Sequence, residues 1–217
     1  MKYLLIHGYG VGLQYSFLKQ AEGDNAGFGA FDEFISSGEA RVFRWDIPRR
    51  LNLMETINPL VNLGHYHKEL DKAQSKETHQ ALQQVLDETE PETIICHSAG
   101  SFLLYSYLQE YTLPSSVTNI VFIQSNIARD FPIPEYLVAK LNQKQITMLN
   151  IYCYWDQALW SLFLLHQYIS LGLWGSKNHL IHNIFFPLYK RFNLHTSSIN
   201  DKRILRVIER YTRVYNS

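Results

Sequence analysis

The sequence predicts an α/β fold, a three-layer α/β/α sandwich around a mostly parallel sheet of about six strands. Short apolar runs rich in β-branched residues, at residues 93–96, 117–124 and 148–154, have the composition of buried parallel strands. Stretches with helical spacing of apolar residues separate these runs, and alternation of strand and helix is typical of a parallel sheet. At 217 residues the chain suits a single domain, residues 1–217.

The first two strands are expected at residues 2–7 and 40–47. The first strand runs directly into a glycine-rich loop, and residues 14–20 then have a helical pattern. In the second strand Arg41 and Arg44 interrupt the apolar residues. This pattern indicates partial exposure, as at an edge of the sheet.

The rest of the chain alternates helices and strands after a stretch, residues 49–64, that gives no clear signal. A long polar helix at residues 70–90 carries one apolar stripe that would pack on the sheet. The further elements are a strand at 93–96, a helix ending near 111, a strand at 117–124, a helix at 135–141, strands at 148–154 and 179–186, and a final helix from about 199.

Residues 92–101, ETIICHSAGS, combine a buried strand with the start of a helix, and Ser98 lies at the turn between them. A nucleophile on such a turn is held in a strained backbone, so small residues must flank it two positions away on each side. Cys96 and Gly100 hold those positions. The helix start also supplies free amides, Ala99 first, that would stabilise a negatively charged oxygen. A serine that only caps the helix is the alternative interpretation.

The residues CHSAG resemble the G-x-S-x-G nucleophile elbow of the α/β-hydrolase superfamily, with Cys96 in place of the first glycine. In that superfamily the loop after an early strand often begins with His-Gly and supplies the second amide of the oxyanion hole. The resemblance implies that Tyr9 donates this amide, while His7 and Gly8 shape the loop. It covers almost the whole chain but begins at the strand that usually comes third, which implies a minimal α/β-hydrolase fold with the leading strands absent.

The resemblance also implies a catalytic acid and a catalytic histidine after later strands, in the chain order Ser, Asp, His. Asp156 follows a predicted strand and is the favoured acid, with Asp130, after the preceding strand, as the reserve. His195 lies between the last strand and the last helix, where the superfamily has its histidine, whereas its rivals His179 and His182 lie within the predicted strand. An aspartate that caps a helix and a surface histidine are the structural alternatives.

Residues 158–174 are unusually apolar but at or below the lower length limit for a helix that spans a bilayer. Three interpretations compete: a core helix that covers the sheet, which we favour, a lid over an acyl pocket, and a helix on a membrane surface. A small cap, where there is one, is expected from residues 126–145 and 158–176. The side chains that would line an apolar pocket are Trp155, Trp160 and Trp174.

The composition argues against several classes of function. The 20 basic and 20 acidic side chains cancel, so nothing favours nucleic acid or an anionic membrane as a partner. Cys96 and Cys153 would lie roughly 10 Å apart in strands separated by one other, beyond disulfide reach, which indicates a reducing compartment. The N-terminal apolar run is too short for a signal peptide, so we expect a cytoplasmic protein without stable membrane insertion.

Two further motifs are incomplete. Gly8 and Gly10 begin a dinucleotide-binding pattern, but the residue at the position of its third glycine is Leu13. His65 and His67 form an H-x-H pair without an evident third ligand, and we expect both on the surface. No metal and no organic cofactor is predicted.

These observations together predict a serine hydrolase that cleaves a carboxylic ester with an apolar acyl or alcohol part through Ser98, His195 and Asp156. Its partner would be a small-molecule, ester-like substrate, and the sequence indicates no oligomeric state. An amidase or thioesterase with the same triad is one alternative. A non-catalytic binding protein on the same fold is the other, and Cys96 in the elbow is the feature that favours it.

Overall fold

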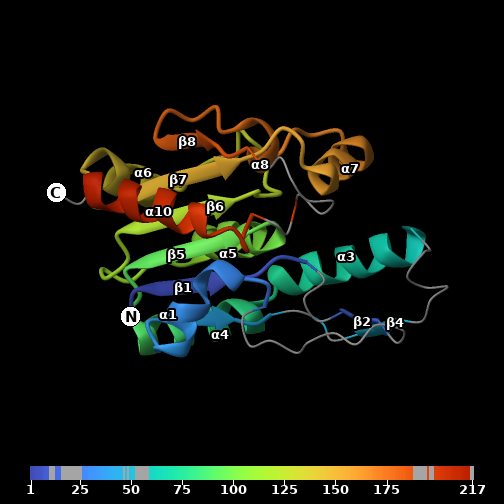
Figure 1. Cartoon of the computed structure of the whole chain (residues 1–217), viewed down its shortest axis with the longest axis horizontal. Helices are drawn as coiled ribbons and strands as arrows, with labels where there is room; N and C mark the ends of the chain where they lie inside the picture. Colours follow the sequence, from blue (N-terminus) through green and yellow to red (C-terminus); the bar gives the residue numbers. More distant parts are fainter. Residues whose placement is uncertain are drawn as a thin grey trace.

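A six-stranded sheet forms the centre of the computed structural model, which describes residues 1–9, 13–15, 26–45, 47, 49–51, 59–187, 195 and 198–215. Every neighbouring pair of strands in it is parallel (Figure 1). The strands, in spatial order, are β3 (Ala40–Phe43), β1 (Tyr3–Ile6), β5 (Thr93–His97), β6 (Asn119–Ile123), β7 (Thr147–Tyr152) and β8 (Ile181–Phe185). The predicted α/β class and the parallel sheet are confirmed.

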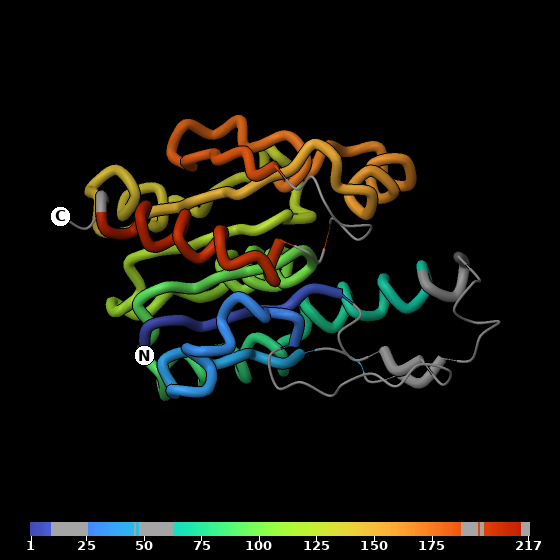
Figure 2. Tube along the Cα trace, in the orientation of Figure 1, coloured from blue at the N-terminus to red at the C-terminus, as the bar shows by residue number. Residues whose placement is uncertain are grey.

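Helices cover both faces of this sheet, so the molecule has three layers. The described helices are η1 (Gly29–Phe31), α1 (Asp32–Ser36), α3 (Pro59–Ala73), α4 (Lys76–Thr89), α5 (Ala99–Glu110), α6 (Glu135–Asn142), α7 (Gln157–His166), α8 (Leu171–Trp174) and α10 (Lys202–Tyr215). Side chains of α3, α4, α5 and α6 form one core with Leu4 and Ile94. Those of η1 and α10 form a second core with Leu5 and Ile95 on the opposite face, and partly buried side chains of α1 pack against it. Figures 1 and 2 show α1 and α10 in front of the sheet.

The burial of each strand agrees with its place in the sheet. Every residue of β5 and β6 is buried, as interior parallel strands require. At one edge, β3 exposes Arg41, which pairs with Glu88 of α4 at 3.0 Å. The edge position predicted for this strand is confirmed.

The two cysteines lie on either side of β6, as predicted. Cys96 belongs to β5, and Cys153 directly follows β7. Both are buried, and no disulfide joins them.

The helix predicted at residues 14–20 is wrong where the structure describes the chain. Leu13–Tyr15 is strand β2, which pairs in parallel with β4 (Arg49–Leu51) in a separate two-stranded sheet. Backbone pairing with a segment distant in the sequence outweighs a local helical pattern over so few residues. Residues 16–20 lie outside the described residues.

The single long helix predicted at residues 70–90 is also wrong, because two helices occupy this part of the chain. The first, α3, begins at Pro59 and ends at Ala73, and α4 begins at Lys76. Ser75 is the N-cap of α4, and its hydroxyl accepts a hydrogen bond from the Thr78 amide at 3.2 Å. This bond satisfies an amide that has no acceptor within the helix, so the chain can turn between the two helices.

The apolar stretch at residues 158–174 is likewise divided between two helices. After α7, Gln167 adopts a left-handed conformation with φ 54°, and α8 follows. Leu171 and Leu173 of α8 are buried, but in α7 Leu159 is the sole buried residue. The favoured interpretation, a core helix, is therefore wrong for α7, which leaves most of its apolar side chains at least partly exposed.

Residues 126–145, where a small cap was conceivable, contribute to the helical layer. Leu137 and Leu141 of α6 belong to the core on the α5 side of the sheet, together with Ile127 and Phe131. A helix that buries its apolar residues in this way supports the sheet and does not stand above it as a lid.

Candidate active site

Ser98 lies where β5 turns into α5, at the carboxyl edge of the sheet. Strand β3 lies on one side of β1, whereas β5, β6, β7 and β8 lie on its other side. The direction in which successive strands are placed therefore reverses between β1 and β5. Ligands of open parallel sheets bind outside the carboxyl ends of the strands at such a point. Ser98 itself has φ 50° and ψ −124°, a costly conformation for a residue with a side chain. The strained turn predicted from the sequence is present.

Two glycines allow the backbone to close around this turn. A Cβ on Gly100 would lie 2.5 Å from the His7 carbonyl oxygen and closer still to that of Ile6, so a glycine is needed for α5 to pack on the end of β1. A Cβ on Gly8 would lie 2.9 Å from the Cβ of Ser98. The loop that follows β1 therefore passes directly over Ser98.

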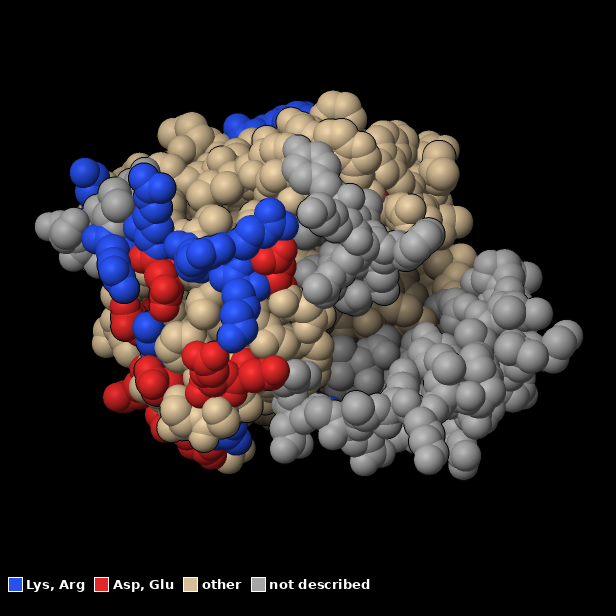
Figure 3. Space-filling model, in the orientation of Figure 1, with Lys and Arg blue, Asp and Glu red and all other residues tan. Residues whose placement is uncertain are grey.

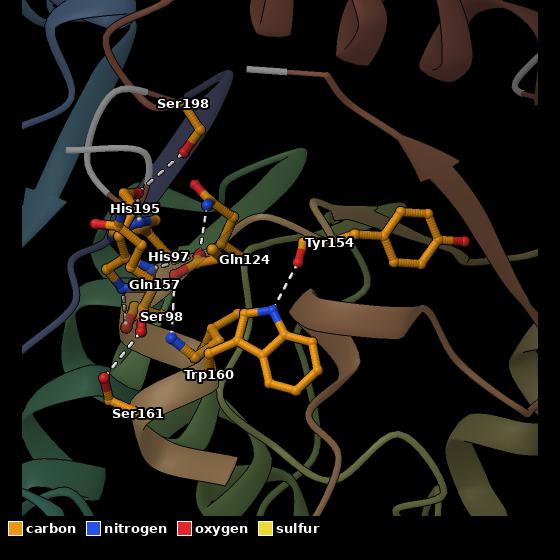
Figure 4. A network of polar contacts seen from close by, with 11 residues as sticks. His97, Ser98, Gln124, Tyr154, Gln157, Trp160, Ser161, His195 and Ser198 are labelled. Atoms are coloured by element: carbon orange, nitrogen blue, oxygen red, sulfur yellow. Dashed lines mark hydrogen bonds and ion pairs between the residues drawn. The ribbon is translucent and has the colours of Figure 1, made fainter. Parts of the chain in front are cut away.

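Three polar side chains from separate parts of the chain form a series of hydrogen bonds (Figure 4). His195 Nε2 lies 2.7 Å from Ser98 Oγ, and His195 Nδ1 lies 2.7 Å from Asp156 Oδ2. Asp156 is fully buried, whereas the His195 side chain retains 16% exposure. In this arrangement a histidine can take the hydroxyl proton while the carboxylate fixes its orientation and tautomer.

The Asp156 carboxylate caps α7 in addition to holding His195. Its Oδ1 accepts from the Leu159 amide at 3.1 Å, and its Oδ2 accepts from the Gln124 side chain as well as from His195. Burial by itself raises the pKa of this carboxyl group, but the charge and hydrogen bond of His195 and the Leu159 amide outweigh it and hold the pKa below its usual value. Asp156 is therefore ionised at neutral pH.

Gln124 belongs to this network although the sequence reasoning missed it. It directly follows β6, is 1% exposed and has a positive φ of 46°. Its side-chain amide donates to the same oxygen of Asp156 that accepts from His195 (Figure 4). The signal that would have identified it is a polar residue at the carboxyl end of a wholly buried strand, beside the edge where ligands bind.

His97, directly before Ser98, is a second residue that sequence reasoning left without a role. Because a carbonyl oxygen only accepts, His97 Nε2 donates to the backbone oxygen of His195, at 2.9 Å. Burial, and then repulsion from His195, lowers the His97 pKa to about 3. His97 is therefore neutral at neutral pH, and it ties the backbone at His195 to the turn that carries Ser98.

Replacing His97 by Gln is expected to make folding less sensitive to acid. The imidazole binds a proton below about pH 6.5 in the unfolded chain, but only below about pH 3 in the folded one. Stability conferred by the neutral form is therefore lost as the pH falls between these values, by at most about 1.4 kcal/mol per pH unit. Urea unfolding of wild type and His97→Gln at about pH 7 and pH 5 measures the difference.

The variant should lose less stability than wild type over this interval, and an equal loss in both proteins would contradict a buried, neutral His97. Asp156 does not interfere with this comparison. Its pKa is lowered on folding, so its contribution to stability is present above the unfolded pKa, near 4, and is lost only as the pH falls below it.

The two amides predicted to stabilise an oxyanion belong to Ala99, which follows Ser98, and to Tyr9, which follows Gly8 on the loop over Ser98. Ala99 is the first residue of α5, and amides of the first helical turn have no acceptor within the helix. Tyr9 lies on the loop after β1, whose conformation depends on His7. The His7 Nδ1 donates to the Gly8 carbonyl at 2.7 Å, and its Nε2 accepts from the Trp45 amide at 3.3 Å. The side chain of His7 thus ties the loop to Gly8 and Trp45.

The three tryptophans predicted to line a pocket lie largely on the surface. The exposed fractions of Trp155, Trp160 and Trp174 are 56%, 38% and 43%. The Trp160 indole donates to the Tyr154 carbonyl at 2.8 Å, and Figure 4 shows it turned toward Tyr154 and away from Ser98. Trp160 therefore belongs to a surface cluster rather than to a wall around Ser98.

The remaining sequence candidates lie apart from this network. Asp130, the reserve acid, is exposed and pairs with Lys177 at 3.2 Å. His65 is 3% exposed, so the expected surface position is wrong for this residue. Glu69, one helical turn further on, compensates its burial, with His65 Nε2 3.3 Å from Glu69 Oε1. Across the described residues, no group of His, Cys, Asp and Glu side chains is placed to hold a metal ion.

Neither a protein-family model nor a curated protein matches this sequence. The class of the protein therefore follows from the strand order and the two helical layers, which define an α/β fold with an all-parallel sheet. The geometry around Ser98 is the basis for the function proposed for the protein.

Proposed function

We propose that this protein is a serine hydrolase of the α/β-hydrolase type that cleaves carboxylic esters with an apolar acyl or alcohol part. The observation that carries the proposal is the joining of Ser98, His195 and Asp156 by two contacts of 2.7 Å around a serine with a strained backbone. A serine that only caps a helix needs neither feature, and the Ser98 hydroxyl makes no capping hydrogen bond.

The proposed reaction has two halves. In the first, His195 Nε2 takes the Ser98 proton as Oγ attacks the ester carbonyl, and the alcohol then leaves with that proton, so that an acyl-serine remains. In the second, His195 takes a proton from water as it attacks the acyl-serine, and returns that proton to Ser98 Oγ as the carboxylic acid leaves. The backbone amides of Tyr9 and Ala99 would stabilise the oxyanion in both halves, one such donor contributing about 3 kcal/mol.

Cysteine in place of the first elbow glycine is compatible with this proposal. Cys96 is fully buried within β5, and Ser98 two residues later still has a positive φ. The close approach that demands a glycine is at Gly100, which this sequence retains. An amide or thioester would follow the same steps, so the leaving group has to be decided by a panel of substrates.

Labelling with a fluorophosphonate probe tests for an activated serine. Wild type should be labelled, whereas Ser98→Ala and His195→Ala should not, because the probe reacts with a hydroxyl whose proton a histidine removes. Ser101→Ala is the matched control, since Ser101 lies on the same helix one turn further on and is also buried. It should be labelled like wild type.

A panel of p-nitrophenyl esters of rising acyl length then tests the apolar substrate. Activity that rises with chain length supports an apolar acyl part, because each buried methylene contributes about 0.8 kcal/mol.

In the labelling experiment, wild type that is folded but never labelled would count against hydrolysis and would favour a binding protein on this fold.

A further inference from the structure

The described part of the chain exposes few large apolar side chains, and nearly all of them lie in one short segment. Apart from Met1, all fall between residues 154 and 174. They are Tyr154, Trp155, Trp160, Leu164, Leu165 and Trp174, and we call them the apolar patch. Leu164 is the most exposed, at 75%. Such a concentration, unlike single exposed residues, is typical of an interaction site.

The aromatic side chains of the patch adjoin one another. The Tyr154 ring lies 5.5 Å from the Trp174 ring and 6.0 Å from the Trp155 ring. The Trp160 ring lies 6.3 Å from that of Trp174. Leu164 stands one helical turn after Trp160 in α7, and therefore on the same side of the helix. The patch is thus one surface on the outer side of α7 and α8.

This surface lacks charge. Residues 145–176 contain no Lys, Arg or Glu, and their single aspartate, Asp156, is buried. In Figure 3 the atoms over α7 are almost all tan, whereas blue atoms gather over α10. Interfaces between proteins ordinarily have a polar, solvent-accessible rim around their apolar centre. Tryptophan and tyrosine, which have an apolar body and a polar edge, are enriched where proteins meet the headgroup region of a lipid layer.

The patch borders the candidate active site. Asp156, which holds His195, is the N-cap of α7, and Trp155 directly precedes it. A helix that lies on a lipid surface buries its apolar face by about 5–10 Å, into the boundary between headgroups and acyl chains. The ester bonds of a glycerolipid lie in that boundary, so docking through α7 would bring them close to Ser98.

We propose that the apolar patch docks on the surface of a neutral lipid aggregate and that the ester substrate is a lipid drawn from that surface. The substrate part rests on the proposed function, whereas the docking part does not. No helix in the described ranges is both long and apolar enough to cross a bilayer, so the contact is with the surface. The absence of charge and the position next to Asp156 favour lipid over a second copy of the chain.

Flotation with vesicles of dialkyl-ether phosphatidylcholine tests the docking, because a hydrolase cannot cleave an ether. Wild type should float with these neutral vesicles, and its tryptophan emission should shift to the blue. Three of its 4 tryptophans belong to the patch, and the other, Trp45, is already buried. The double variant Leu164→Glu/Leu165→Glu should bind about ten-fold less, because each change places a charge in the apolar layer.

The matched control is Gln80→Glu/Ala81→Glu, which adds the same charge at two adjacent exposed positions of α4. It should bind like wild type. Wild type that stays unbound, or a Leu164→Glu/Leu165→Glu variant that binds equally well, would overturn the proposal. Binding that requires anionic lipid would also overturn it, as would a lipid-free dimer that this double variant dissociates.

Docking and hydrolysis can fail separately in these experiments. Flotation on ether lipid without fluorophosphonate labelling would retain the docking and reject the hydrolase. Labelling of Ser98 without flotation would retain the hydrolase and reject the lipid surface as the source of its substrate.

Discussion

Replacing Asp156 by Asn is expected to lower kcat/KM of the proposed ester hydrolysis by about 10⁴-fold while the protein stays folded. The side chains are nearly identical in size, so the effect comes from hydrogen bonding. Three donors face the carboxylate: the Leu159 amide on Oδ1, and Gln124 and His195 on Oδ2. An amide offers a single oxygen, so its NH₂ must face at least one of these donors.

The variant has two ways to place that amide, and neither supports the reaction as well as the carboxylate does. If the oxygen keeps the cap on Leu159, the NH₂ group faces His195 and moves the imidazole proton to Nε2, which then cannot accept the Ser98 proton. If the amide is reversed, its oxygen still accepts from His195, but its NH₂ faces the Leu159 amide, so the cap of α7 is lost at a cost of about 1 kcal/mol. A neutral amide also fails to stabilise the positive charge that His195 acquires during the reaction. In both cases kcat should fall far more than stability.

Asp130→Asn is the control for this experiment. Asp130 is the other acid that follows a strand in this region, but it is exposed and pairs with Lys177. Steady-state kinetics of the control should match wild type. Equal losses in Asp130→Asn and Asp156→Asn, or near-normal activity in Asp156→Asn, would refute the assignment of Asp156 as the acid.

The sequence predicted best those features that depend on local signals. A β-branched run followed at once by small residues identified the turn at Ser98. The resemblance to the α/β-hydrolase superfamily then implied an acid after a later strand and a histidine between the last strand and the last helix. Parallel strands place their carboxyl ends along one edge, which is consistent with Ser98, Asp156 and His195 meeting there.

Features that depend on tertiary contacts were missed. Gln124 is one polar residue after a strand, and its role follows only from the position of Asp156 across the sheet edge. The division of the apolar stretch at Gln167 has no proline or glycine to signal it. His65 was expected on the surface because its H-x-H pair has no evident third ligand, and nothing local signals that Glu69 would be buried beside it.

Replacing Gly100 by Ala is expected to destabilise the fold by about 3 kcal/mol or more, or to prevent folding. The added methyl group would overlap the carbonyl oxygens of Ile6 and His7, which are backbone atoms and cannot rotate away. Relief requires α5 to move off the end of β1, where Leu103 and Leu104 of α5 share a core with Leu4. Urea unfolding at neutral pH measures the loss.

Gly64→Ala separates this clash from the general effect of removing a helical glycine. Gly64 lies within α3, is exposed, and has no atom within 4 Å of the added Cβ. Because alanine is the better helix former, this control should gain about 1 kcal/mol. A loss of unfolding free energy in Gly100→Ala together with a gain in Gly64→Ala would show that the close contact between α5 and β1 decides the outcome. A Gly100→Ala variant as stable as wild type would mean that the turn at Ser98 is not held as tightly as this packing requires.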